Sequence, residues 1–88
     1  MIQQKILMVD DQPANLVSLD AILEAPHREL IKAHSGPEAL KVLLKEDISL
    51  VLLDVQMPGM DGFEVAELMR QRKDTQNIPI IFVTAISK

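Results

Sequence analysis

The most constraining segment of this 88-residue chain is residues 50–55, which read Leu-Val-Leu-Leu-Asp-Val. Its first four residues are all apolar, and its first polar residue is Asp54. A short, continuous apolar run of this kind is typical of a parallel strand whose two faces are both covered. Parallel neighbours need crossover connections, which are usually helices. The segment therefore indicates an α/β domain.

The remainder of the chain fits this interpretation. Strands are predicted at residues 6–9, 30–33, 50–55 and 79–85, and helices at 13–25, from Ser35 onward and at 61–72. Pro13 suits the first turn of a helix. Ser35 with Glu38, and Asp61 with Glu64, have the spacing of a helix capping box. Three strand–helix pairs followed by a strand predict a parallel sheet with right-handed crossovers.

Composition excludes several kinds of function. The chain has no Cys, which rules out disulfides, thiolate metal sites and Cys nucleophiles. A net charge of −4 and only two aromatic residues, both Phe, argue against a nucleic-acid-binding module. No apolar run is long enough to span a membrane. The 48% apolar content is compatible with a packed core, so we expect one soluble, cytoplasmic domain.

The acids occupy informative positions. Asp10 and Asp11 follow the first predicted strand, Asp54 lies at the carboxyl end of the third, and Thr84 ends the fourth. Ligands of open parallel sheets bind outside the carboxyl ends of the strands. If the first and third strands are neighbours, the three carboxylates converge. Each residue also has a structural interpretation, such as Asp11 capping the next helix, and only their joint placement favours a site.

Converging carboxylates repel one another and need a proton or a cation. Two unit charges 4 Å apart cost about 4 kcal/mol at an effective dielectric constant of 20. Ligands that are all oxygen atoms suit a hard cation, and Mg²⁺ is the best candidate. A cation beside a carboxylate and a hydroxyl is suited to phosphoryl chemistry.

Three segments together resemble the receiver domain of two-component response regulators. They are residues 6–15 (ILMVDDQPAN), 50–62 (LVLLDVQMPGMDG) and 78–85 (IPIIFVTA). The resemblance extends over essentially the whole chain. It implies the three-layer flavodoxin-like (CheY-like) fold, whose strand order is 2-1-3-4-5 in the family. In this chain it implies the order 2-1-3-4, with the fifth strand and the last helices missing.

The resemblance also implies roles for residues around the acids. Asp54 matches the aspartate that accepts a phosphoryl group from the phosphohistidine of a partner kinase. Asp11 matches the direct Mg²⁺ ligand, and Asp10 matches the acid that acts through water. Gln56 matches the position whose backbone carbonyl completes the metal site.

Two further matches concern switching. Thr84 matches the hydroxyl that turns toward the phosphoryl group, and Ala85 matches the small residue that leaves room for it. The implied partner is a sensor histidine kinase or a phosphotransfer protein. The implied activity is not that of an enzyme with turnover, although such a domain assists its own phosphorylation and dephosphorylation.

The chain departs from the family at its C-terminus. Family members carry a Lys at the end of a fifth strand, and the sequence stops at Lys88 before any match to it. We therefore expect residues 1–88 to be a single receiver domain that is incomplete at its C-terminus. Residues 79–85 would then form an apolar sheet edge, which predicts self-association through the fourth strand.

Two other functions remain open from the sequence. A phosphatase of the haloacid dehalogenase type also places Asp at the end of a parallel strand, but it has a second acid two residues later, where this chain has Gln56. A receiver-like interaction module that no longer switches is the other alternative. Retention of the acids and of Thr84 favours a domain that switches.

Overall fold

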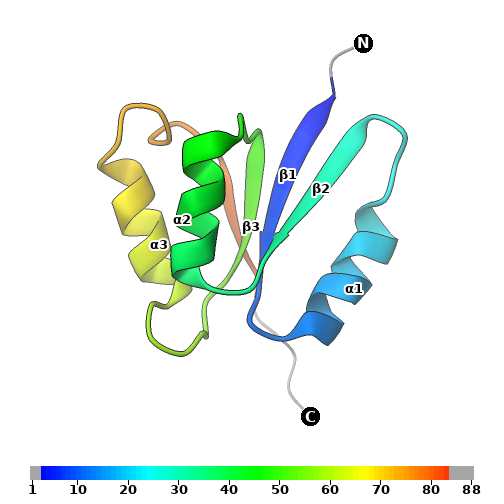
Figure 1. The fold of residues 1–88 in the computed structure, drawn as a ribbon, viewed down its shortest axis with the longest axis horizontal. Helices are drawn as coiled ribbons and strands as arrows, with labels where there is room; N and C mark the ends of the chain where they lie inside the picture. The colour runs from blue at the N-terminus through cyan, green and yellow to red at the C-terminus, as the bar shows by residue number, and fades with distance from the viewer. Residues whose placement is uncertain (1–2, 84–88) are drawn as a thin grey trace.

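The computed structural model describes residues 3–83 as a parallel sheet between two layers of helices (Figure 1). The elements in chain order are β1 (Gln4–Val9), α1 (Pro13–Leu23), β2 (Arg28–Ala33), α2 (Gly36–Lys45), β3 (Leu50–Asp54), α3 (Gly62–Arg70) and β4 (Ile80–Val83). Helices α2 and α3 lie on one face of the sheet and α1 lies on the other. None of the helices in this part of the chain combines the length and hydropathy needed to cross a membrane.

The sheet has the strand order β2-β1-β3-β4, so the predicted order 2-1-3-4 is confirmed. β1 is paired in parallel with both β2 and β3. Val9, the last residue of β1, lies opposite Ala33 on one side and Leu53 on the other. The first and third strands are therefore neighbours, which is the condition on which convergence of the acids depends.

Both faces of the central strands are buried, which explains why the strands lack polar alternation. Leu7 and Val9 of β1 pack with Val51 and Leu53 of β3 in the cluster beneath α2 and α3. The strand residues that alternate with these point to the opposite face and pack with α1 in a second cluster. Its buried members are Ile6 and Met8 of β1, Leu52 of β3 and Leu16 of α1.

The element ends differ from the predictions by a few residues. β1 and β2 each begin two residues earlier than expected, because Gln4 and Arg28 extend the parallel pairing with backbone groups and need no apolar side chain. β3 ends at Asp54 rather than Val55, and α1 ends at Leu23. Val83 is the last residue described, so the predicted continuation of the fourth strand through residues 84 and 85 lies outside the described part.

One of the two predicted capping boxes is complete. At α3, Asp61 accepts a hydrogen bond from the N–H of Glu64, and the Glu64 carboxylate accepts one from the N–H of Asp61. At α2, Ser35 Oγ accepts the N–H of Glu38, but the Glu38 carboxylate accepts the N–H of His34, 2.7 Å away. The reciprocal half of the second box is therefore displaced by one residue, and the prediction of a full box was wrong there.

Candidate functional site

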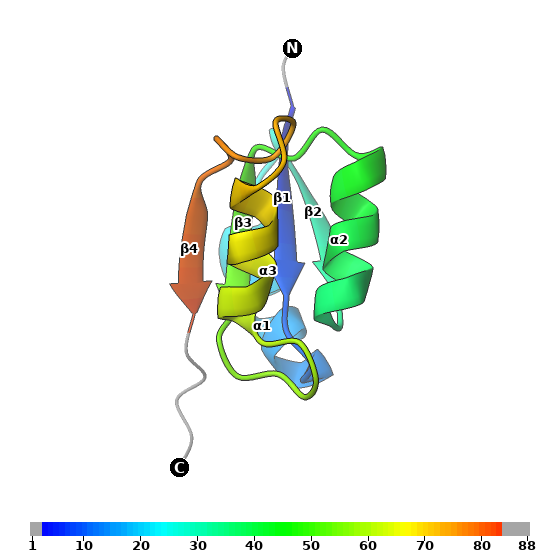
Figure 2. The same cartoon turned by 90° about the vertical axis from the view of Figure 1, so that its left-hand side faces the viewer.

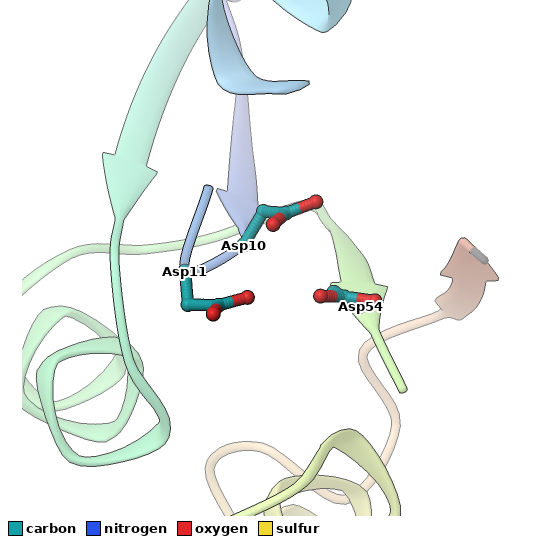
Figure 3. Close-up of side chains that lie close together, drawn as sticks. All are labelled: Asp10, Asp11 and Asp54. Carbon is teal, nitrogen blue, oxygen red and sulfur yellow. The ribbon is translucent and has the colours of Figure 1, made fainter. Parts of the chain in front are cut away.

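Three carboxylates meet at the carboxyl edge of the sheet (Figure 3). Asp10 follows β1 directly, Asp11 is the next residue, and Asp54 is the last residue of β3. The pairing of Val9 with Leu53 brings the ends of these two strands together. One carboxylate oxygen from each acid lies within 4.8 Å of the others. The predicted convergence of Asp10, Asp11 and Asp54 is thus found in the structure.

The two acids at the strand ends are almost completely buried. Asp10 is 2% exposed and Asp54 is 3% exposed, whereas Asp11 is half-buried. The two oxygens of Asp10 accept hydrogen bonds from the backbone N–H of Gln12 (2.9 Å) and from Nδ2 of Asn15 (3.1 Å). Asp54 Oδ1 accepts one from the N–H of Gln56, 3.2 Å away. The chain's own donors therefore orient both buried carboxylates.

The environment of Asp54 disfavours its ionised form. Burial is the largest cause and raises the pKa of its carboxyl above the ordinary value. The nearby negative charges of Asp10 and Asp11 raise this pKa further, and the N–H of Gln56 acts in the opposite direction. A cation between the three acids would remove the repulsion and keep Asp54 ionised.

The donor set fits a small hard cation. All three side chains offer carboxylate oxygens, which are the ligands preferred by Mg²⁺ and Ca²⁺. Asp11 forms no side-chain hydrogen bond among the described residues, so its carboxylate is available to bind directly. It also does not cap α1, whose N-cap is Gln12 without a side-chain cap. The structural alternative for Asp11 is therefore not supported.

The segment after Asp54 is fixed by a close main-chain approach. Gly62, the first residue of α3, is buried, and its N–H donates to the carbonyl of Val55 at 3.2 Å. A Cβ at Gly62 would overlap the backbone oxygen of Asp54 and come within 3.0 Å of Val55 Cα. The start of α3 is thus packed directly against the strand end that carries Asp54.

The predicted roles of Gln56, Thr84 and Ala85 in the site stay predictions. The structure shows the N–H of Gln56 on Asp54, and the role of its carbonyl as a metal ligand stays a prediction. Thr84 and Ala85 lie outside the described residues. Sequence reasoning missed Asn15, which contacts Asp10, and Gly62, although the Asp61–Gly62 pair at a helix start was a visible signal.

The fold and the cluster of three acids define a parallel α/β domain with a candidate cation site at the ends of β1 and β3. The family model of the response regulator receiver domain matches residues 6–88, and the chain belongs to this family. Response regulator PleD of Caulobacter vibrioides is 42% identical over 82 residues. That match covers 93% of this chain but 18% of PleD, so the chain spans less than a fifth of this relative.

Solved structures agree with the assignment. Response regulator TrrA of Thermotoga maritima, in complex with Mg²⁺ and BeF, has a TM-score of 0.86 and 39% identity. The match covers 97% of this chain and 72% of that one. The chemotaxis protein CheY4 of Vibrio cholerae has a TM-score of 0.88 and 29% identity, with 98% and 72% covered. The CheY-like fold is therefore shown.

Proposed function

We propose that the chain is the phosphoacceptor domain of a two-component signalling protein, with Asp54 as the acceptor. The observation that carries this proposal is the buried carboxylate of Asp54 at the end of β3, beside Asp10 and Asp11. Matching segments occur in a response regulator, PleD, and in a sensor protein, GacS of Pseudomonas syringae. The proposed donor is accordingly a histidine kinase or a phosphotransfer protein, acting in the cytoplasm.

The proposed reaction is transfer of a phosphoryl group from a phosphohistidine. A bond forms between an Asp54 oxygen and phosphorus while the nitrogen–phosphorus bond breaks and its electron pair returns to the imidazole. Such transfers depend mainly on positioning and charge neutralisation. Asp11 and Asp54 would hold Mg²⁺ together with the carbonyl of Gln56, and Asp10 would act through water. Bound Mg²⁺ would supply the positive charge that three carboxylates require.

The consequence of phosphorylation would be a shift between two conformations. An acyl phosphate adds negative charge and strong acceptor oxygens at the end of β3. We propose that the hydroxyl of Thr84 turns toward the phosphoryl group and that the small side chain of Ala85 leaves room for that group. The domain would assist its own phosphorylation and dephosphorylation without being an enzyme with turnover. A phosphatase is disfavoured, because the exposed Gln56 stands where a second acid would be needed.

Intact-mass measurement after incubation with Mg²⁺ and acetyl phosphate tests this proposal. We expect one added phosphoryl group on the wild-type chain and none on Asp54→Asn or in the presence of EDTA. Asp47→Asn is the matched control, because it makes the same chemical change at an exposed position before β3 begins. Unchanged modification of Asp54→Asn would show that another residue is the acceptor. No modification of a folded wild-type chain would contradict the proposal.

We also propose that β4 associates with a second copy of this 88-residue chain. β4 is the edge strand of the sheet in residues 3–83, as Figure 2 shows. Ile81 is 52% exposed and Phe82 is 43% exposed, and the Phe82 ring packs on that of Phe63 at a centroid distance of 5.0 Å. An apolar edge is a template for strand pairing.

Light scattering measures this association. We expect a mass larger than a monomer at micromolar concentration. Ile81→Lys or Phe82→Lys should restore the monomer, because a charged side chain on an edge strand disfavours pairing with another strand. A monodisperse monomer of the wild-type chain would contradict the expectation.

A further inference from the structure

The side chain of Asn15, on helix α1, forms a hydrogen bond with the carboxylate of Asp10. Asn15 Nδ2 donates to Asp10 Oδ2 at 3.1 Å, and the N–H of Gln12 donates to Oδ1 at 2.9 Å. Asp10, Asp11 and Asp54 form an acidic triad, and among residues 3–83 Asn15 is the one side chain outside this triad that donates a hydrogen bond to it. Since Asp10 is 2% exposed, these two donors replace most of the water that an exposed carboxylate would bind.

The position of Asn15 on α1 explains how its amide reaches Asp10. Gln12 is the N-cap and Pro13 is the first helical residue, so Asn15 is the third. The backbone N–H of Asn15 already donates to the carbonyl of Gln12 at 3.0 Å. Its side chain extends back past the helix start to the carboxylate that follows β1.

An amide has the chemistry that this position requires. It donates a hydrogen bond and so orients the carboxylate, yet it carries no charge. A Lys or Arg would bring its own positive charge to the place of the cation, and an Asp would add a fourth negative charge. Asn15 thus fixes Asp10 without competing for the acids.

We propose that Asn15 is a positioning residue of the metal site, which holds the Asp10 carboxylate in the orientation that its water-mediated contact with the cation requires. This inference rests on the proposed function, because it assumes that the acids bind Mg²⁺. Groups that orient metal ligands through hydrogen bonds typically contribute about 10- to 100-fold in metal affinity, and we expect the lower end of this range because Asp10 acts through water. Asn15 also ties Asp10 to the first turn of α1, so this helix would be held more firmly when the site is filled.

Mg²⁺ titration of the 88-residue chain by calorimetry, with melting temperatures measured without Mg²⁺, tests the role. We expect Asn15→Leu, which removes the amide at similar size, to raise the Mg²⁺ Kd about tenfold. Asn15→Gln keeps the amide and should recover most of the affinity. Ser18→Ala is the matched control on α1, because it removes the bond from Ser18 Oγ to the carbonyl of Ala14 (3.1 Å) away from the acids. Its Kd should equal that of the wild type.

The outcomes separate the inference from the proposed function. A wild-type chain that binds no Mg²⁺ overturns the metal site and this inference with it. Wild-type binding together with a Kd for Asn15→Leu within twofold of the wild type, or a tighter one, overturns only the role of Asn15. If Asn15→Leu does not fold, Asn15→Ala provides the same comparison, because Ala is favourable in a helix. A merely structural role would lower the melting temperature and leave the Kd unchanged.

Discussion

Gly62→Ala is expected to lower the free energy of unfolding by about 3 kcal/mol, at the upper end of the usual cost of overpacking. The added Cβ would overlap the backbone oxygen of Asp54, and neither main-chain segment is free to move. β3 is paired on both sides, and α3 is fixed by its capping box. Without this overlap the same substitution would be favourable, because Ala is preferred over Gly in helices by about 1 kcal/mol. A lower free energy of unfolding for Gly62→Ala would therefore indicate the overlap, whereas a higher one would indicate that the added Cβ is accommodated.

Gly59→Ala is the matched control. Gly59 has a φ of +75°, and nothing lies within 4 Å of the position that a Cβ would take. Its replacement should cost only the left-handed backbone conformation, about 1–2 kcal/mol. Urea denaturation of both variants measures the difference. A Gly62→Ala chain that is as stable as Gly59→Ala would show that the start of α3 can move away from Asp54.

Asp54→Asn is expected to stabilise the Mg²⁺-free chain at pH 7 by on the order of 2 kcal/mol. At an effective dielectric constant of 20, each pair of charges 4.8 Å apart costs about 3.5 kcal/mol, and the hydrogen bonds to the acids offset part of that repulsion. The raised pKa of Asp54 gives the pH dependence. The native chain binds this proton more tightly than the unfolded chain, so its stability falls as the pH rises through the native pKa of Asp54.

The difference between Asp54→Asn and the wild type should therefore be largest at neutral pH. It should shrink as the pH falls through the native pKa toward the ordinary value of an Asp. Mg²⁺ should stabilise the wild type by mass action and the variant much less. Urea denaturation with Mg²⁺ and with EDTA, at neutral and acidic pH, measures both effects. An Asp54→Asn chain that is less stable than the wild type in EDTA at pH 7 would contradict the expectation.

The sequence was sufficient for the parts of the molecule that a hydrophobic pattern determines. Residues 50–53 identified a strand buried on both faces, and the acids after it identified the edge where the site lies. The pairing of β1 with β3 then brought Asp10, Asp11 and Asp54 together, as the family resemblance implied. Such a pattern is visible in the sequence because burial on both faces of a central strand requires apolar residues at successive positions.

Other features depend on geometry that has no sequence pattern. The pairing of Gln4 with Arg28 uses backbone groups, which any residue possesses. The carboxylate of Glu38 could reach either of two N–H groups, and only the loop conformation selected that of His34. The contact of Asn15 with Asp10 depends on how the first turn of α1 meets the sheet.

The acidic triad is divided between two strands whose alignment is not covalently fixed. A slip of β3 by one residue against β1 would turn its side chains to the opposite faces and move Asp54 away from Asp10. Slipped sheets would then lack the cation-binding arrangement that the native alignment creates. A ligand that binds one alignment and not the others stabilises that alignment by mass action. Mg²⁺ present during refolding would therefore increase the fraction of chains in which β1 and β3 are correctly aligned.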